Sequence, residues 1–291
     1  MLAALHGLAA GETGRPDNAD WTIPQGWDRY TAAEHATWKT LFERQTRLLP
    51  GHACDAFVEG MKNLPLAAHE IPDFRELSEV LMRHTGWQVV AVPGLVPDDV
   101  FFNHLANRRF PAGQFIRKPH QLDYLQEPDV FHDVFGHVPM LMNPVMADYI
   151  QAYGQGGLRA LKLGKLPYLA RVYWYTVEFG LVQQADGLRV YGAGIASSRT
   201  ETLFSVEDPS PNRVAFDLER VMRTLYRIDD FQETYFVLDH LDQLLELAHI
   251  DFADAYQRVD AATELQPGEL LASDRVLHRG SGRQHARRKE S

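Results

Sequence analysis

Hydrophobic side chains recur at helical spacing along much of the chain, and this periodicity predicts a mainly helical fold. Thr31 and Glu34 fit a capping box that starts a first helix, in which Trp38, Leu41 and Phe42 follow at helical spacing. The same pattern predicts further helices over 53–62, 72–84, 143–162, 166–184, 214–225 and 239–260, and from Asp98 and Asp129 onward. Short apolar runs between turn residues predict strands over 87–92, 110–117, 188–194 and 235–238. The expected fold class is mainly α with small β pieces.

The chain shows no internal repeat and no internal linker, so we expect a single folded domain over residues 29–265. Residues 1–28 contain Gly, Pro, Asp and Asn without periodicity and are expected to form an N-terminal arm. Residues 266–291 are expected to form a C-terminal tail. Its end, 279–291, holds five basic residues and one acidic residue, which predicts a disordered segment or, alternatively, a basic anchor for an acidic partner.

Composition narrows the classes of protein that fit. The chain has 291 residues, of which 45% are hydrophobic and 23% charged, as in globular proteins. Its net charge of −10 argues against non-specific binding to nucleic acid. It has no apolar run of about 18 residues, so we expect no membrane-spanning helix. The single cysteine, Cys54, cannot form an internal disulfide, and the first residues lack the basic start of a secretory signal, so we expect a cytoplasmic protein.

The segment EPDVFHDVFGHVPML (127–141) holds two histidines in an informative context. Among 13 histidines, the spacing of His132 and His137 could arise by chance, but a predicted helix starts at Asp129 and ends near Gly136 and Pro139. On an ideal α-helix, residues five apart differ by about 140° and do not share a face. The helix must therefore loosen or end before His137 if both histidines bind one metal ion, and Gly136 is the residue expected to permit this.

The segment ARVYWYTVEFG (170–180) is apolar nearly all round, which predicts a buried helix with Glu178 inside it. A buried carboxylate needs a partner, which can be a metal ion or a Lys or Arg side chain. Two histidines and one carboxylate form the ligand set of non-haem Fe(II) oxygenases. A Zn(II) hydrolase can use the same three ligands. Residues alone also leave open a metal-free helical binding module in which His132, His137 and Glu178 are structural.

The order of several motifs resembles the catalytic domain of the pterin-dependent aromatic amino acid hydroxylases, above all the short, single-domain bacterial phenylalanine 4-hydroxylases. The likeness rests on three long motifs, namely EPDVFHDVFGHVP, YWYTVEFG and YGAGIASS. It extends to VPGLVPDDVFF (92–102), QFIR (114–117) and FQETYFV (231–237). It implies the catalytic fold of that family over residues 29–265, with Fe(II) as cofactor and tetrahydropterin and O2 as co-substrates.

The resemblance also implies roles for individual residues. His132, His137 and Glu178 match the iron ligands of the family. The positions that match its pterin site are Phe101, on which the pterin would stack, and Gly94, Leu95, Val96, Asp133 and Tyr173. The candidates for the substrate site are Arg117 for the amino acid carboxylate, Pro128 and Trp174 as walls of the ring pocket, Ser197 as support for His132 and the carboxylate, and Tyr124 at the edge.

The chain departs from the animal members of the family at two positions of this pattern. Asp133 stands where they carry glutamate, which still allows a carboxylate to contact the pterin through water. Leu125 stands where they carry threonine and cannot supply its hydroxyl, so carboxylate binding must depend on Arg117, Ser197 or the backbone. Trp174 matches the phenylalanine and tyrosine enzymes, whereas the tryptophan enzymes carry phenylalanine there.

The resemblance therefore implies conversion of L-phenylalanine to L-tyrosine. Hydroxylation of tryptophan or tyrosine is the alternative within the family. No sustained heptads follow residue 260, so we expect a monomer that has no nucleic-acid or membrane partner.

Overall fold

The computed structural model describes residues 16, 18–123 and 127–282 of the chain. The helices are α1 (Ala32–Leu48), α2 (Asp55–Asn63), α3 (Phe74–His84), α4 (Asp98–Ala106), α5 (Val138–Leu141), α6 (Pro144–Leu163), α7 (Leu166–Tyr173), α8 (Ala193–Ala196), α9 (Arg199–Glu207), α10 (Leu218–Arg223), α11 (Gln243–Ala248) and α12 (Phe252–Asp260). The strands are β1 (Gln88–Val92), β2 (Arg109–Gly113), β3 (Leu181–Gln184), β4 (Gly187–Val190), β5 (Asn212–Ala215), β6 (Thr234–Leu238) and β7 (Val276–His278). Two π-helical segments, η4 (Phe131–His137) and η5 (Trp174–Glu178), complete the helical part together with short 3₁₀ turns at Trp27–Arg29 and Pro119–Gln121.

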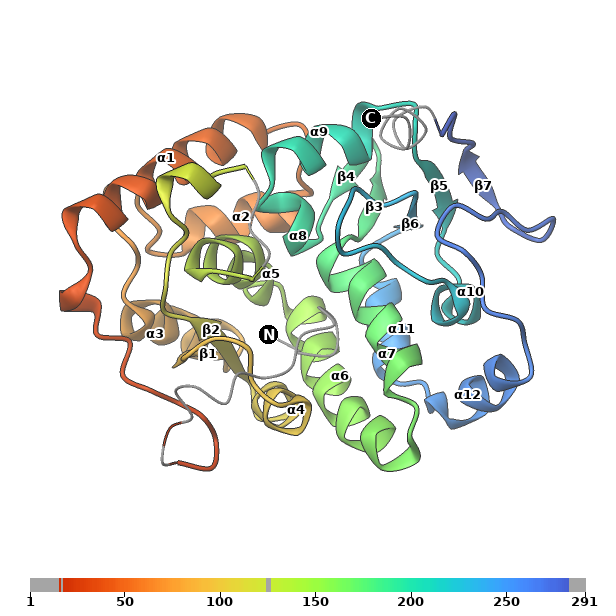
Figure 1. Ribbon diagram of the computed structural model, residues 1–291, viewed down its shortest axis with the longest axis horizontal. Helices are drawn as coiled ribbons and strands as arrows, with labels where there is room; N and C mark the ends of the chain where they lie inside the picture. The colour runs from red at the N-terminus through yellow and green to blue at the C-terminus, as the bar shows by residue number, and fades with distance from the viewer. Residues whose placement is uncertain (1–15, 17, 124–126, 283–291) are drawn as a thin grey trace.

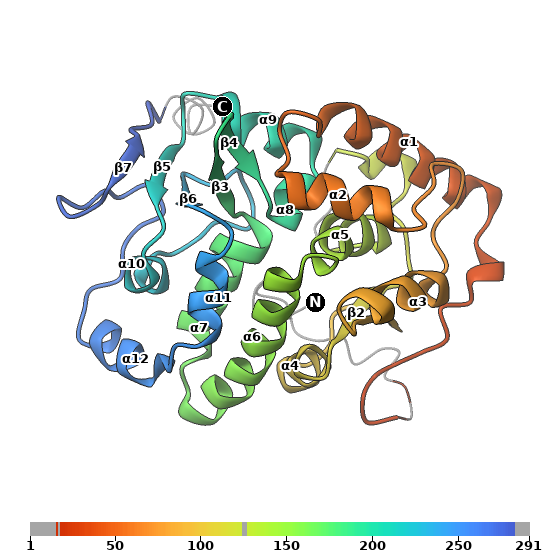
Figure 2. The same cartoon turned by 180° about the vertical axis from the view of Figure 1, so that it is seen from behind.

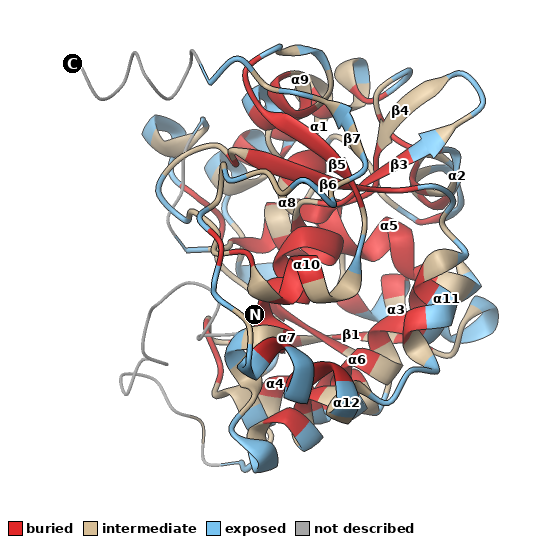
Figure 3. Ribbon diagram, turned by 90° about the vertical axis from the view of Figure 1, so that its right-hand side faces the viewer, coloured by how far each residue is buried: buried red, intermediate tan, exposed pale blue. Residues whose placement is uncertain are grey.

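Two small sheets lie on different sides of the helical centre of the molecule (Figures 1 and 2). One sheet is the parallel pair β1–β2. The other has the strand order β4-β3-β6-β5-β7, with β6 parallel to both of its neighbours. Every residue of β6 is buried, as expected for the central strand of a covered sheet. Figure 3 shows that buried residues fill the interior, whereas the exposed residues lie on the outer faces of helices such as α11 and α12.

The mainly helical class with small β pieces is confirmed, and so is the start of the first helix. The Thr31 hydroxyl accepts a hydrogen bond from the Glu34 backbone N–H, and the Glu34 carboxylate accepts one from the Thr31 backbone N–H. This reciprocal box stabilises the first turn of α1. Trp38 and Leu41 on this helix are buried in the core.

Two of the segments predicted to be entirely helical contain a helix and a strand. The helix expected over 166–184 ends with η5, and its last four residues form β3. The helix expected over 214–225 begins only at Leu218, after the Asp217 side chain caps it, because the residues before it pair with β6. In both segments the apolar run is short, and pairing with a neighbouring strand outweighs the helical periodicity.

Other element boundaries also differ from the prediction. The helix expected over 239–260 is divided into α11 and α12, since the Asp251 side chain caps a new start. The strand expected over 110–117 is confined to β2, and the strand expected over 188–194 ends before α8. Helix α9 was not predicted at all, although its Ser198 cap is visible in the sequence.

The described parts of both chain ends contact the folded core. The Ile23 backbone N–H donates to Ala91 of β1, and His104 of α4 hydrogen-bonds to the Asp20 carbonyl. At the other end, β7 pairs with β5, so part of the expected tail takes part in the larger sheet. The division into arm, domain and tail stays a prediction, and residues 283–291 lie outside the described part. No helix in the described residues is long and apolar enough to cross a membrane.

Candidate active site

The two histidines of the first motif meet because their helix is a π-helix. Residues 131–137 follow i→i+5 hydrogen bonding, in which residues five apart lie close to one face. The Nε2 atoms of His132 and His137 are 3.3 Å apart. The prediction that the helix must loosen before His137 is therefore confirmed, and the loosening extends over the whole segment.

Gly136 is required at this place, but for another reason than backbone freedom. A Cβ atom at Gly136 would lie 2.8 Å from the carbonyl oxygen of Ala193, closer than real Cβ contacts allow. The absence of a side chain thus lets η4 pack directly against α8. This contact matters for the site because α8 leads into Ser197, which touches the first histidine.

A second π-helical segment supplies the carboxylate. Glu178 ends η5, and its Oε1 and Oε2 atoms lie 3.2 Å from His137 Nε2 and 3.5 Å from His132 Nε2. A Cβ atom at Gly192 would lie 2.5 Å from the Glu178 carbonyl oxygen, so the YGAG turn packs closely on this residue. All three side chains are largely buried, with exposed fractions of 14% for His132, 4% for His137 and 3% for Glu178.

These three side chains fit a single metal ion. Their ligand atoms all lie within 4.8 Å of one another. Two ligand atoms at about 2.1 Å from one ion and roughly 90° apart would be about 3 Å from each other, close to the spacing of the two nitrogens. Two imidazoles and one carboxylate on one side leave the remaining coordination positions open, as in non-haem iron oxygenases.

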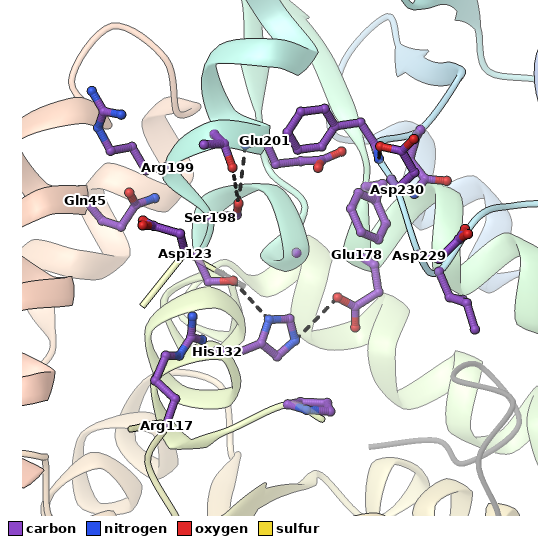
Figure 4. Close-up of a pocket in the computed structure, with 18 of the residues that line it drawn as sticks. Gln45, Arg117, Asp123, His132, Glu178, Ser198, Arg199, Glu201, Asp229 and Asp230 are labelled. Atoms are coloured by element: carbon purple, nitrogen blue, oxygen red, sulfur yellow. Dashed lines mark hydrogen bonds and ion pairs between the residues drawn. The ribbon is translucent and has the colours of Figure 1, made fainter. Parts of the chain in front are cut away.

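Hydrogen bonds around His132 orient its ring toward His137 and Glu178. Its Nδ1 atom is 2.9 Å from Ser197 Oγ, so Nε2 faces His137 and Glu178, as Figure 4 shows for the glutamate. Its backbone N–H donates to Asp129 Oδ1 at 3.0 Å, which bears out Asp129 as a cap for this helix. Such outer contacts fix the imidazole tautomer and its direction.

A cavity of about 520 Å³ opens beside His132 and Glu178. Its walls come from α1, described residues of 117–123 and 127–128, η5, the α8–α9 connection and the segment 227–232 (Figure 4). Trp174 and Pro128, the predicted walls of a ring pocket, both line it. The Trp174 ring stacks on Tyr226 with a centroid distance of 4.3 Å and packs on Phe179 at 4.7 Å. The result is a rigid aromatic wall next to the metal ligands.

Arg117 also lines the cavity, but its guanidinium forms a buried ion pair with Asp129. Nε and Nη2 donate to the two carboxylate oxygens at 2.8 and 2.9 Å, and Nη1 donates to the Leu122 carbonyl at 3.3 Å. Asp129 is fully buried, so the pair is held in place by burial as well as by its fork geometry. The Arg117 guanidinium was expected to bind the carboxylate of the amino acid substrate. It is instead directed at Asp129, a partner that the sequence did not indicate.

The candidate pterin residues are absent from the described lining of this cavity. Phe101 is fully buried on α4, with its ring 6.0 Å from that of Tyr173, and the Tyr173 ring lies 6.4 Å from that of His137. Asp133 is buried, which raises the pKa of its carboxyl to about 6, and its Oδ2 accepts a hydrogen bond from the Gly113 N–H. Gly94 lies close to Glu127, because a Cβ there would be 2.8 Å from the Glu127 carboxylate.

Leu95 and Val96, the remaining two candidate pterin residues, are also buried. None of the six candidate pterin residues is among the described residues that line the 520 Å³ cavity.

Two buried amides were missed from the sequence. Gln45 of α1 donates to the Ala196 carbonyl at 2.6 Å and lines the cavity, and Gln232 contacts Trp174. The burial of Gln45 could have been predicted, because Gln45 lies four residues after Leu41 and so continues the apolar face of α1. Tyr124 and Leu125 lie outside the described residues.

This ligand triad and fold define an aromatic amino acid hydroxylase. The sequence profile of the biopterin-dependent aromatic amino acid hydroxylases matches residues 22–261, and the chain belongs to this family. It is 65% identical to phenylalanine-4-hydroxylase of Caulobacter vibrioides over 262 residues, which cover 90% of this chain and 89% of the relative.

The fold is also similar to solved phenylalanine hydroxylase structures from Chromobacterium violaceum. One with bound oxidised Fe(III) superposes with a TM-score of 0.87 at 57% identity, covering 93% of this chain and 96% of that chain. Another, with bound iron and phenylalanine, has a TM-score of 0.86 at 56% identity, covering 90% of this chain and 95% of that chain. These similarities do not favour the zinc hydrolase or the metal-free binding module.

Proposed function

We propose that the chain is a non-haem Fe(II), tetrahydropterin-dependent monooxygenase that converts L-phenylalanine to L-tyrosine with O2. The observation that carries this proposal is the meeting of His132, His137 and Glu178 beside a cavity walled by Trp174. Relatives of this length carry the name phenylalanine-4-hydroxylase, and a solved relative holds both iron and phenylalanine.

His132, His137 and Glu178 are the proposed iron ligands. Iron held there supplies the redox chemistry and the open coordination positions that activation of O2 by a reduced pterin requires. The role of the protein is to aim the Nε2 atoms of both imidazoles at one point and to bury the carboxylate. Ser197 contributes by fixing the His132 ring through its Nδ1 atom.

The remaining candidates divide into two groups. We assign Phe101, Gly94, Leu95, Val96, Asp133 and Tyr173 to pterin binding. Trp174 and Pro128 hold the ring of the amino acid, because both line the cavity next to Glu178. Arg117 and Ser197 stay candidates for binding the substrate carboxylate. Because the Arg117 guanidinium is already paired with Asp129, we infer that it attracts the substrate carboxylate by its positive charge and not by a bidentate pair of hydrogen bonds. Tyr124 is kept as a candidate for the edge of the same site.

The surroundings in which the enzyme acts are inferred from composition. An acidic chain whose single cysteine is buried and free fits a cytoplasmic enzyme. We infer that it works as a monomer on a small-molecule substrate, without nucleic acid or membrane as partner. A sedimentation mass close to that of a dimer or tetramer would refute the monomer.

The substrate assignment is tested by side-by-side turnover of phenylalanine, tyrosine and tryptophan. The Fe(II)-loaded protein is supplied with tetrahydropterin and air, and kcat/KM is measured for each amino acid. We expect the highest value for phenylalanine, with tyrosine as its product. A higher kcat/KM for tryptophan would replace the assignment by the alternative within the family.

A further inference from the structure

The segment 227–232 covers one side of the substrate cavity without regular secondary structure. All six of its residues line the cavity, and Ile228 within it is 49% exposed. The ion pair between Arg227 and Asp229 is largely exposed and adds little rigidity. The Phe231 ring stacks on Phe204 of α9 at a centroid distance of 4.6 Å and holds the segment from one side. A further contact connects the segment to the wall of the ring pocket.

The side chain of Gln232 supplies that connection from inside. It is 1% exposed, although it belongs to a segment at the surface of the molecule. Its Nε2 atom donates to the Arg227 carbonyl at 2.9 Å and to the Asp230 carbonyl at 3.5 Å. Its Oε1 atom accepts a hydrogen bond from the Arg227 N–H at 3.4 Å. One amide thus closes the loop from residue 227 to residue 232.

The same amide also binds the wall of the ring pocket. Trp174 donates its indole N–H to Gln232 Oε1 at 3.0 Å, and this contact is buried. A second constraint on the indole is its packing, because the ring stacks on Tyr226 and lies tilted against Phe179. Stacking fixes the plane of the Trp174 ring, whereas the hydrogen bond fixes its rotation within that plane.

We infer that Gln232 is a positioning residue that sets the shape of the substrate pocket by holding Trp174 and the segment 227–231 in one fixed relation. This inference rests on the proposed function, since it concerns the pocket for the aromatic amino acid. Gln232 reaches neither the metal ligands nor the candidate pterin residues by any contact described above. Its effect should therefore be confined to binding and selection of the amino acid.

Two substitutions separate the functions of the amide. Gln232→Leu removes every hydrogen bond, whereas Gln232→Glu keeps the acceptor for Trp174 and loses the donor to the loop carbonyls. We expect Gln232→Leu to weaken phenylalanine binding by about tenfold, from the usual contribution of one or two hydrogen bonds. Gln232→Glu should weaken it at least as much, because its buried carboxylate would face the Arg227 and Asp230 carbonyls without a counter-ion. Gln183→Leu is the matched control, because Gln183 is exposed on β3 and donates to the adjacent Gln184 carbonyl.

The readout is the dissociation constant of phenylalanine, measured by anaerobic calorimetry on the Fe(II)-loaded protein. The KM for tetrahydropterin and the bound iron per chain are measured in parallel. We expect both to stay within about twofold of the wild type in all three variants. A variant that weakens iron, pterin and phenylalanine alike would show a general structural role and overturn the inference.

A double-mutant cycle tests whether Gln232 acts through Trp174. Trp174→Phe keeps an aromatic ring in the stack but removes the indole N–H. Gln232→Leu should then weaken phenylalanine binding by about twofold or less in the Trp174→Phe background, because the shared hydrogen bond is already lost. An equal effect of Gln232→Leu in both backgrounds would overturn the inference. Failure of the wild type to form tyrosine would overturn the proposed function instead, and the calorimetry keeps the two failures apart.

Discussion

Two ion pairs beside the cavity differ in how deeply they are buried, since one belongs to the inner half of the site and the other to its rim. Arg117 and Asp129 form the inner pair at 2.8 Å, with exposed fractions of 9% and 0%. Arg44 and Asp123 form the rim pair at 3.0 Å, with exposed fractions of 36% and 71%. The distances are almost equal, so the difference between them is burial.

Burial gives the inner pair a role that the rim pair cannot have. Asp129 also accepts hydrogen bonds from the backbone N–H groups of Arg117 and His132, so it links the substrate side of the cavity to the first iron ligand. Removing one partner of a buried pair leaves an uncompensated charge, which is strongly destabilising. A rim pair in water is screened and contributes little. We therefore expect the site to be rigid near His132 and to tolerate substitutions at the mouth of the cavity.

The largest effect is expected at a metal ligand. His132→Ala removes one of three ligand atoms and should lower tyrosine formation by more than about 100-fold, since even outer partners of ligands are worth about 10–100-fold. The protein should stay folded, because an alanine at this partly exposed position leaves the π-helical backbone in place. Iron per chain, tyrosine formation and the thermal midpoint are measured together. Full iron content in this variant would exclude His132 as a ligand.

The inner ion pair should give the next largest effect. Asp129→Asn keeps the shape of the side chain but leaves the buried Arg117 charge without a counter-ion. We expect a loss of about 3–5 kcal/mol in the free energy of unfolding, measured by denaturant titration. Asp123→Asn is the matched control at the rim and should change it by less than about 1 kcal/mol. Equal effects of the two substitutions would remove the contrast between the two halves of the site.

Ser197→Ala should have an intermediate effect on the metal rather than on the fold. It removes the hydroxyl that holds His132 Nδ1, and we expect iron affinity to fall by about 10–100-fold. The neighbouring Ser198→Ala serves as a control, because Ser198 caps α9 and should reduce stability by about 1 kcal/mol with iron affinity unchanged. If Ser197→Ala binds iron as the wild type does, the serine does not orient His132.

The smallest effect is expected at the rim. Arg44→Ala breaks the exposed pair with Asp123 and should change stability by less than about 1 kcal/mol. The KM for phenylalanine should stay within about twofold, and added salt should remove any remaining difference. A KM for phenylalanine raised by about tenfold or more would show that the rim takes part in substrate binding.

The meeting of His132, His137 and Glu178 could be predicted from the sequence because their motifs carry geometric information. The five-residue spacing of His132 and His137 required a distorted helix, and the structure contains one. Gly136 was correctly singled out, but its reason is tertiary, since the close approach of Ala193 cannot be read from local sequence. The partner of Arg117 was missed for the same reason: Asp129 fits a helix cap, and its ion pair depends on the tertiary position of Arg117.

The incorrect elements share a physical cause. Residues 181–184 (LVQQ) and 212–215 (NRVA) each hold only two adjacent apolar residues, which fit either a helix or a buried strand. Pairing with β6 between them decides the outcome. Gln232 lies within the FQETYFV motif of the resemblance, but the motif did not single it out, because one amide in a polar loop looks the same whether it faces water or the pocket wall. The break between α11 and α12 was more accessible, since Asp251 is a strong capping residue in the sequence.

The central claim is that two π-helical segments bring three ligands to one iron site that carries the hydroxylation. The direct test is to titrate metal-free protein with Fe(II) and to follow bound iron and tyrosine formation from phenylalanine, tetrahydropterin and air. We predict that both rise together and stop at about one iron per chain, as three ligands on a single ion require, and that Zn(II) does not replace iron. Tyrosine formation without bound iron, or the same rate with Zn(II), would contradict the account.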